Sequence, residues 1–97
     1  MVRIYWTSQA REDLREIRAF IARDAPKTAS AFVRRLREAV GRLRDFPESG
    51  QVVPELGRTE IREILRGNYR LIYRFRDNRV DILAVFHSAR LLSDDLL

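Results

Sequence analysis

The chain contains no cysteine, which excludes disulfide bonds, thiolate metal sites and a cysteine nucleophile. Histidine is almost as scarce: His87 is the only one among 97 residues, so a metal site built from several histidines is excluded as well. The four glycines stand apart from one another and form no glycine-rich phosphate-binding loop. We therefore expect neither a metal nor another cofactor.

Long apolar runs are also missing. No run approaches the length needed to cross a bilayer, and the first residues are too polar for the apolar core of a secretory signal. Apolar residues make up 45% of the chain and charged residues 34%, which is typical of a globular protein. We expect one cytoplasmic domain spanning residues 1–97, with no membrane attachment.

Acidic residues are outnumbered. Lysine and arginine together number 19 against 14 acids, for a net charge of +5, and Lys27 is the only lysine. A basic excess favours nucleic acid or an acidic protein as partner, so a simple nucleic-acid-binding domain is one hypothesis. Many helix arginines alternate with Glu and Asp, however, which is typical of a solvated helix face.

The periodicity of the apolar residues predicts a strand, two amphipathic helices and then three strands. The expected bounds are 2–6 for the first strand, 8–24 and 26–46 for the helices, and 61–65, 69–76 and 80–87 for the later strands. Thr7 or Ser8 supplies the first N-cap, and Phe20 widens the apolar stripe of that helix. Pro26 opens the second helix, so the two helices form an antiparallel hairpin.

This order predicts an α+β fold in two layers, with the helix hairpin packed on one face of an antiparallel β-sheet. Residues 47–57, rich in proline and glycine, form a connecting loop. In the strand 69–76 the aromatic and leucine side chains face the helices, and the arginines face the other way. Residues 80–87 alternate in the same manner, and the tail 88–97 carries leucines that are exposed or await a partner.

The candidate site follows from that alternation. An open sheet face lined by arginines is a platform for phosphates or for an acidic peptide. The candidate binding residues are Arg62, Arg70, Arg74, Arg76 and Arg90. His87, at the end of the last strand and close to Arg90, is a candidate general base or a structural histidine.

Several local patterns strengthen this interpretation. They are Ala10-x-x-Asp13-Leu14-x-x-Ile17, Phe46-Pro47-x-x-Gly50, Val53-Pro54-Glu55-Leu56, Arg62-Glu63-Ile64, Tyr69-Arg70-Leu71-Ile72-Tyr73-Arg74 and Val85-Phe86-His87-Ser88-Ala89-Arg90. With the order of elements, they make the whole chain resemble the RelE/ParE superfamily of bacterial type II toxin–antitoxin toxins. The resemblance implies a growth-inhibiting toxin that forms a hetero-oligomer with a cognate antitoxin.

Two activities compete within that superfamily. RelE-like toxins cleave mRNA on the ribosome, and the resemblance would then make Arg70, Arg90 and His87 catalytic. The lysines that RelE carries before the matching strand are absent here, and no tyrosine follows Arg90; Glu60, Glu63 and His87 remain as proton carriers. ParE-like toxins inhibit DNA gyrase and need no catalytic set, so the resemblance favours a ParE-like gyrase inhibitor.

Overall fold

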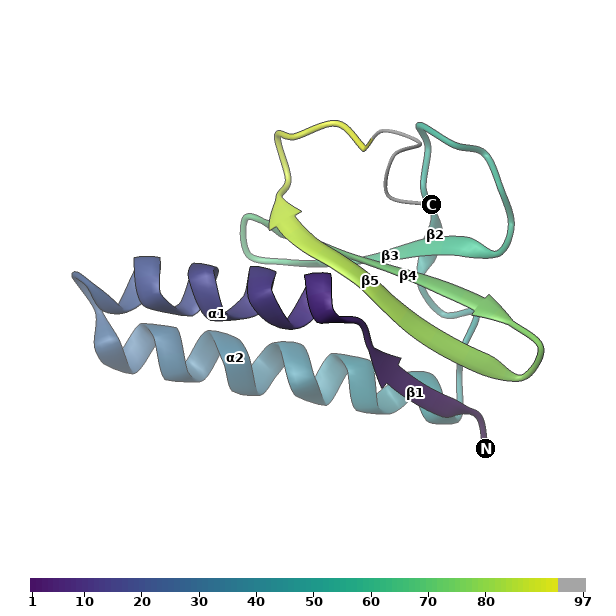
Figure 1. The fold of residues 1–97 in the computed structure, drawn as a ribbon, viewed down its shortest axis with the longest axis horizontal. Helices are drawn as coiled ribbons and strands as arrows, with labels where there is room; N and C mark the ends of the chain where they lie inside the picture. Colours follow the sequence, from purple (N-terminus) through teal and green to yellow (C-terminus); the bar gives the residue numbers. More distant parts are fainter. Residues whose placement is uncertain (93–97) are drawn as a thin grey trace.

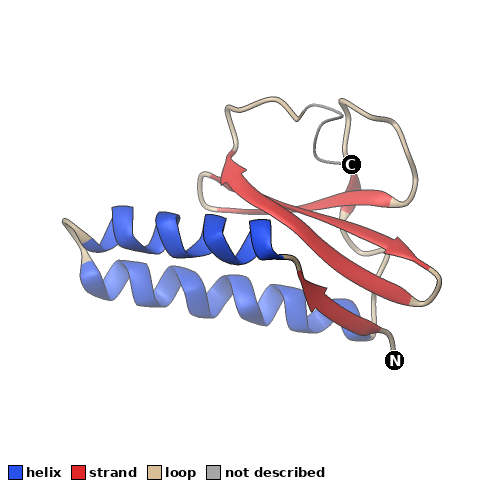
Figure 2. Ribbon diagram, viewed as in Figure 1, coloured by secondary structure: helices blue, strands red, loops and turns tan. Residues whose placement is uncertain are grey.

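Two antiparallel helices cover one face of a five-stranded sheet in the computed structural model, which describes residues 1–92 (Figures 1 and 2). The elements are β1 (Arg3–Trp6), α1 (Ser8–Ala22), α2 (Pro26–Gly41), a 3₁₀ turn η1 (Arg42–Arg44), β2 (Gln51–Val52), β3 (Ile61–Arg66), β4 (Tyr69–Arg76) and β5 (Arg79–His87). The sheet order is β1-β5-β4-β3-β2. The two-layer α+β architecture is confirmed, with one refinement: β1 lies parallel to β5, so the sheet is mixed.

The helix boundaries follow from local chemistry. The Thr7 hydroxyl accepts a hydrogen bond from the Ala10 amide and donates one to the Ile82 carbonyl at 2.7 Å, so the N-cap also ties α1 to β5. Pro26 opens α2 in its first turn, where its missing N–H costs nothing. The placement of Phe20 in the apolar stripe was wrong, because its side chain is 64% exposed.

A β-bulge in β5 changes the face of the sheet on which the side chains of this strand lie. Ile72 pairs with Ala84 and Tyr73 pairs with Ile82, which leaves Leu83 as an extra residue in β5. Side chains before the bulge and after it therefore exchange faces. The prediction of unbroken alternation over residues 80–87 was wrong for this reason.

Both faces of the sheet consequently carry a core. On the helix face the sheet contributes Leu71, Tyr73 and Val80, which pack with the helices. On the outer face the second core consists of Val53, Ile61, Ile72, Leu83, Ala84, Phe86 and Leu92. The loop before β3 and the segment after β5 cover this face, so the expectation of an open outer face was wrong over its central part.

The structure explains the Phe46-Pro47-x-x-Gly50 pattern by its contacts with Tyr73. The buried Tyr73 hydroxyl donates to the Pro47 carbonyl at 2.8 Å and accepts from the Gly50 amide at 3.0 Å. Burial raises the pKa of Tyr73, so this hydroxyl remains a donor. The contact fixes the chain where it leaves the hairpin and starts β2, a short strand that the sequence did not predict.

Among the residues described, no helix combines the length and apolar character needed to cross a membrane. The C-terminal leucines differ from one another. Leu91 is 77% exposed, whereas Leu92 is buried in the outer core. Leu96 and Leu97 lie outside the described residues.

Candidate functional site

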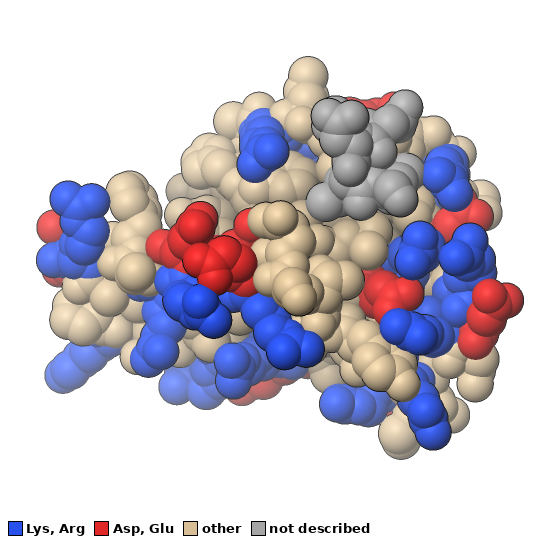
Figure 3. All heavy atoms as spheres, in the orientation of Figure 1, with Lys and Arg blue, Asp and Glu red and all other residues tan. Residues whose placement is uncertain are grey.

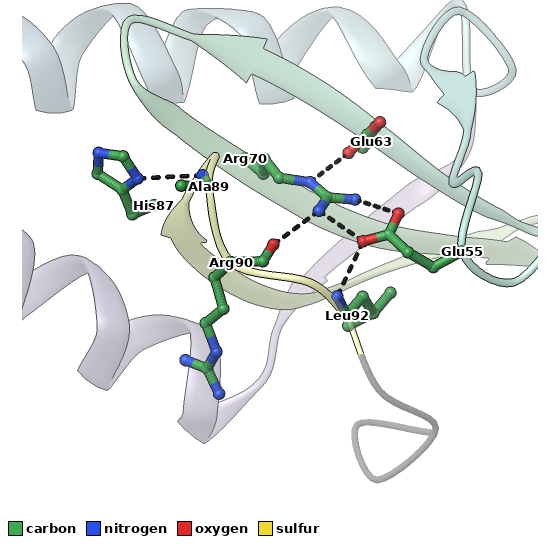
Figure 4. A network of polar contacts seen from close by, with 7 residues as sticks. All are labelled: Glu55, Glu63, Arg70, His87, Ala89, Arg90 and Leu92. Carbon is green, nitrogen blue, oxygen red and sulfur yellow. Dashed lines mark hydrogen bonds and ion pairs between the residues drawn. The ribbon is translucent and has the colours of Figure 1, made fainter.

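Arg70 lies on the outer face, and each of its three guanidinium nitrogens donates at least one hydrogen bond (Figure 4). Nε donates to Glu63 at 2.7 Å, and the two Nη atoms donate to the Glu55 carboxylate at 2.7 and 2.8 Å. Nη1 also donates to the Arg90 carbonyl at 2.9 Å. The Arg70 side chain is only 7% exposed, so the expectation that it stands on an open face was wrong.

Glu55 connects this arginine to the C-terminal segment. Its carboxylate also accepts from the Leu92 amide at 2.8 Å. The hydrogen bonds from Arg70 and then from Leu92 lower the pKa of Glu55 from 4.5 to about 2, and the hydrogen bond to Glu55 raises the pKa of Arg70. We call Arg70, Glu55, Glu63 and the backbone of Arg90 and Leu92 the Arg70 clasp. It joins the loop before β3, the sheet and the C-terminal segment.

The clasp makes stability depend on pH. Because the folded-state pKa of Glu55 is depressed, its contribution is fully present above about pH 4.5 and is lost as pH falls toward about 2. We expect the wild type to lose more stability than Glu55→Gln when urea unfolding is compared at pH 6 and pH 3. Glu16→Gln, an exposed change on α1, serves as the control and should behave as the wild type. Equal losses in wild type and Glu55→Gln would contradict this role.

The other sheet arginines do not join Arg70 in one platform. Arg62 pairs in register with Tyr73, which places it on the opposite face of the sheet, where it donates to the Gly50 carbonyl at 2.9 Å. Placing Arg62 on the same face as Arg70 was therefore wrong. Arg74 pairs with Asp81 at 3.4 Å, and Arg76 is exposed at the end of β4.

His87 is separated from Arg70 by the sheet itself. Its ring lies 5.8 Å from that of Tyr69, on the face that carries the helices, and its Nδ1 accepts from the Ala89 amide at 3.1 Å. Arg90 presents its carbonyl to Arg70, while its guanidinium points away and lies over Phe86, 5.2 Å from the ring centre (Figure 4). The structure brings Arg70 and Arg90 together around Phe86 but leaves His87 outside the cluster.

A second charged feature, which sequence reasoning missed, is a groove of about 790 Å³ between α1, α2 and β1. Five arginines line this arginine groove: Arg11, Arg15, Arg18, Arg37 and Arg44. In Figure 3 basic side chains gather along the lower edge of the molecule, over the helix hairpin. The spacing of the three α1 arginines, four and then three residues apart, places them on one helix face and could have indicated the groove. No group of three or more potential metal ligands occurs among residues 1–92.

The fold is that of the small toxins of type II toxin–antitoxin systems. A chain of the chromosomal ParDE TA system from P. aeruginosa superposes with a TM-score of 0.73 at 22% identity, covering 90% of this chain and 96% of that one, and shows the fold. A chain of the toxin–antitoxin complex RelBE2 from Mycobacterium tuberculosis is 31% identical with a TM-score of 0.57, covering 89% and 96%.

The sequence comparisons specify the family. Toxin RelE2 from Caulobacter vibrioides is 33% identical over 92 residues, which is 94% of this chain and all of the relative. A family model described as the ParE toxin of the type II toxin–antitoxin system parDE matches residues 4–92. The chain belongs to this ParE toxin family.

Proposed function

We propose that this toxin inhibits DNA gyrase stoichiometrically in the bacterial cytoplasm, without cleaving RNA, and that a cognate antitoxin neutralises it in a hetero-oligomeric complex. The family supports the first part of the proposal, because the resemblance to ParE-like toxins implies gyrase as the target. The observation that argues against RNA cleavage is the Arg70 clasp.

A ribonuclease of the RelE kind needs an arginine that meets the scissile phosphate. It also needs one group to activate the ribose hydroxyl and another to protonate the leaving oxygen. The Arg70 guanidinium already bonds two carboxylates and a carbonyl, so a phosphate would have to displace Glu55. His87 lies on the other face of the sheet from Arg70. These contacts favour a structural Arg70 and a toxin that acts by binding.

The test uses purified gyrase, relaxed plasmid and ATP. Increasing amounts of the toxin are expected to abolish supercoiling once the toxin concentration approaches that of the gyrase. Prior addition of the antitoxin should restore supercoiling. Denatured toxin at equal concentration is the control. Undiminished supercoiling at a large molar excess of folded toxin would refute the gyrase proposal.

A RelE-like activity is the second candidate, and two observations favour it. The relatives Toxin RelE2 and RelBE2 carry RelE names, and Arg70 and Arg90 lie together around Phe86. This candidate requires Glu55 to release Arg70 when ribosomal RNA and mRNA are bound. It would be supported by new 5′ ends within ribosome-bound messages soon after the toxin is induced.

A further inference from the structure

Three arginines lie side by side across the end of the sheet that carries the β4–β5 turn. Arg3 of β1 is in register with Arg79 of β5, and Arg79 is in register with Arg76 of β4. In Figure 1 the start of β1, the end of β4 and the start of β5 meet at the right-hand side of the molecule. Neighbouring strands are about 4.8 Å apart, so this arginine row spans about 10 Å.

The arginine row lies on the outer face of the sheet, beyond the part that the outer core covers. Ile4, Phe75 and Val80 alternate with the row along their strands and pack with the core on the helix face. Successive side chains of a strand point to opposite faces, so the row points away from the helices. All three arginines are exposed, and in Figure 3 basic side chains gather at the right-hand side, near the β4–β5 turn. The row is therefore accessible to a partner on the face opposite the hairpin.

Like charges in register raise the free energy of the sheet, because directly opposed cations repel one another. The acids close to the row compensate for only part of this charge. Asp81 pairs with Arg79 at 2.8 Å, but it is shared with a second arginine. Arg76 meets only Asp77, which is 3.8 Å away and 90% exposed, and Arg3 forms no ion pair within residues 1–92. The row therefore keeps positive charge that a bound anion would neutralise.

Tyr5 holds two side chains of the row in place. The Arg79 guanidinium lies over the Tyr5 ring, 4.0 Å from its centre, and Arg3 donates to the Tyr5 hydroxyl at 3.4 Å. Of the Arg79 donors, only Nε is used within the described part of the chain, for Asp81 at 2.8 Å. A stacked guanidinium keeps its N–H groups in its own plane, where phosphate oxygens can accept from them. Such pre-ordered side chains lose less entropy when they bind.

The surroundings of the row favour a phosphate backbone over a peptide or unpaired bases. The next row inward consists of Tyr5, Asp81 and Arg74, so the surface is polar and its one aromatic ring is already covered by Arg79. A peptide interface depends on buried apolar or aromatic anchors, and single-stranded bases stack on free aromatic faces. The row and its inner neighbours provide neither. A duplex, by contrast, presents regularly spaced phosphates, which guanidinium groups bind without contact to bases.

We propose that the arginine row binds the phosphate backbone of double-stranded DNA. For its setting this rests on the proposed function, since the DNA is then the duplex that gyrase holds, and it adds a direct contact between toxin and DNA. Contacts with phosphates alone carry no sequence information, so binding is independent of base sequence. Each phosphate contact contributes about 0.9 to the slope with which log K falls against log salt concentration.

Binding of the full-length toxin to a short labelled duplex of mixed sequence, followed by fluorescence anisotropy from low to physiological salt, tests the proposal. The row variant Arg3→Gln/Arg76→Gln removes two exposed charges and leaves the ion pair of Arg79 intact. The matched control Arg23→Gln/Arg35→Gln makes the same charge change at exposed positions of the helix hairpin. Thermal unfolding checks that both variants keep the stability of the wild type.

We expect the row variant to bind the duplex at least about tenfold more weakly at low salt, with a salt slope shallower by about 1.8. The control should stay within about threefold of the wild type, because its charges lie in the other layer of the fold. Unchanged binding in the row variant, or equal weakening of both variants, would overturn the proposal. So would tighter binding, through the same row, to a single-stranded RNA of the same length.

Supercoiling assays with the same proteins separate this inference from the proposed function. If wild-type toxin leaves supercoiling intact while its binding to free duplex still depends on the row, the gyrase target is wrong and the row assignment stands. If wild-type toxin inhibits gyrase and duplex binding ignores the row, the row assignment is wrong and the target stands. When both hold, bound DNA should tighten the binding of wild-type toxin to gyrase more than that of the row variant.

Discussion

Replacing Arg70 with alanine is expected to lower the free energy of unfolding by about 3–5 kcal/mol, because it leaves a buried carboxylate without its partner. Glu63 is 5% exposed and pairs with Arg70 at 2.7 Å, so its charge cannot reach water without a rearrangement of the sheet. Small domains have a total stability of about 5–15 kcal/mol. The variant should therefore be partly unfolded at 37 °C, and its C-terminal segment should be released.

Urea unfolding followed by circular dichroism measures this change. Arg76→Ala removes an exposed arginine from the same strand and should shift stability by less than about 0.5 kcal/mol. The double variant Arg70→Met/Glu63→Leu removes both buried charges and should recover most of the loss. A destabilisation below about 1 kcal/mol for Arg70→Ala would show that the clasp does not hold the fold.

The expected destabilisation by Arg70→Ala changes how mutations at Arg70 are interpreted. If Arg70 were catalytic, alanine would abolish RNA cleavage and leave the fold intact. The clasp predicts that the fold itself suffers, so loss of growth inhibition by an Arg70 variant says nothing about catalysis. Stability must be measured before toxicity is compared.

Gly50→Ala is expected to lower the free energy of unfolding by about 1–3 kcal/mol. A Cβ at Gly50 would lie 2.6 Å from the Tyr73 hydroxyl and 2.7 Å from the Glu63 carbonyl. The second contact is with backbone of β3, so a side-chain rotation cannot relieve it, and the sheet edge must move.

Gly41→Ala provides the matched control. A Cβ there meets only the tip of Arg44 at 3.5 Å, which is an ordinary contact. Alanine at this helical position should stabilise the fold by about 0.5–1 kcal/mol. Thermal unfolding of the two variants should therefore move the midpoint in opposite directions, and equal midpoints would refute the close approach at Gly50.

Much of the scaffold was predictable because its signals are local. The helix bounds at Thr7 and Pro26 come from capping and proline geometry, and the strand 69–76 comes from strict alternation. The parallel pairing of β1 and the bulge at Leu83 have no local signal. Both arise from the way that distant segments pack on the sheet.

The site was less predictable for the same reason. Arg70 was identified as important, but its partner Glu55 lies 15 residues earlier in a loop whose path periodicity cannot show. The outer face was expected to be open because two helices can cover only one side of a sheet. The loop before β3 and the segment ending at Leu92 supply the missing cover. The arginine groove was overlooked because its arginines come from three elements.

The most direct test of the account is the order in which synthesis stops after the toxin is induced alone in a bacterial host. Incorporation of labelled thymidine and of labelled amino acid is followed in parallel, with an uninduced culture as control. A gyrase inhibitor predicts that thymidine incorporation falls first while translation continues. Early loss of amino-acid incorporation, with DNA synthesis continuing, would contradict it and point to Arg70 and Arg90 at the ribosome.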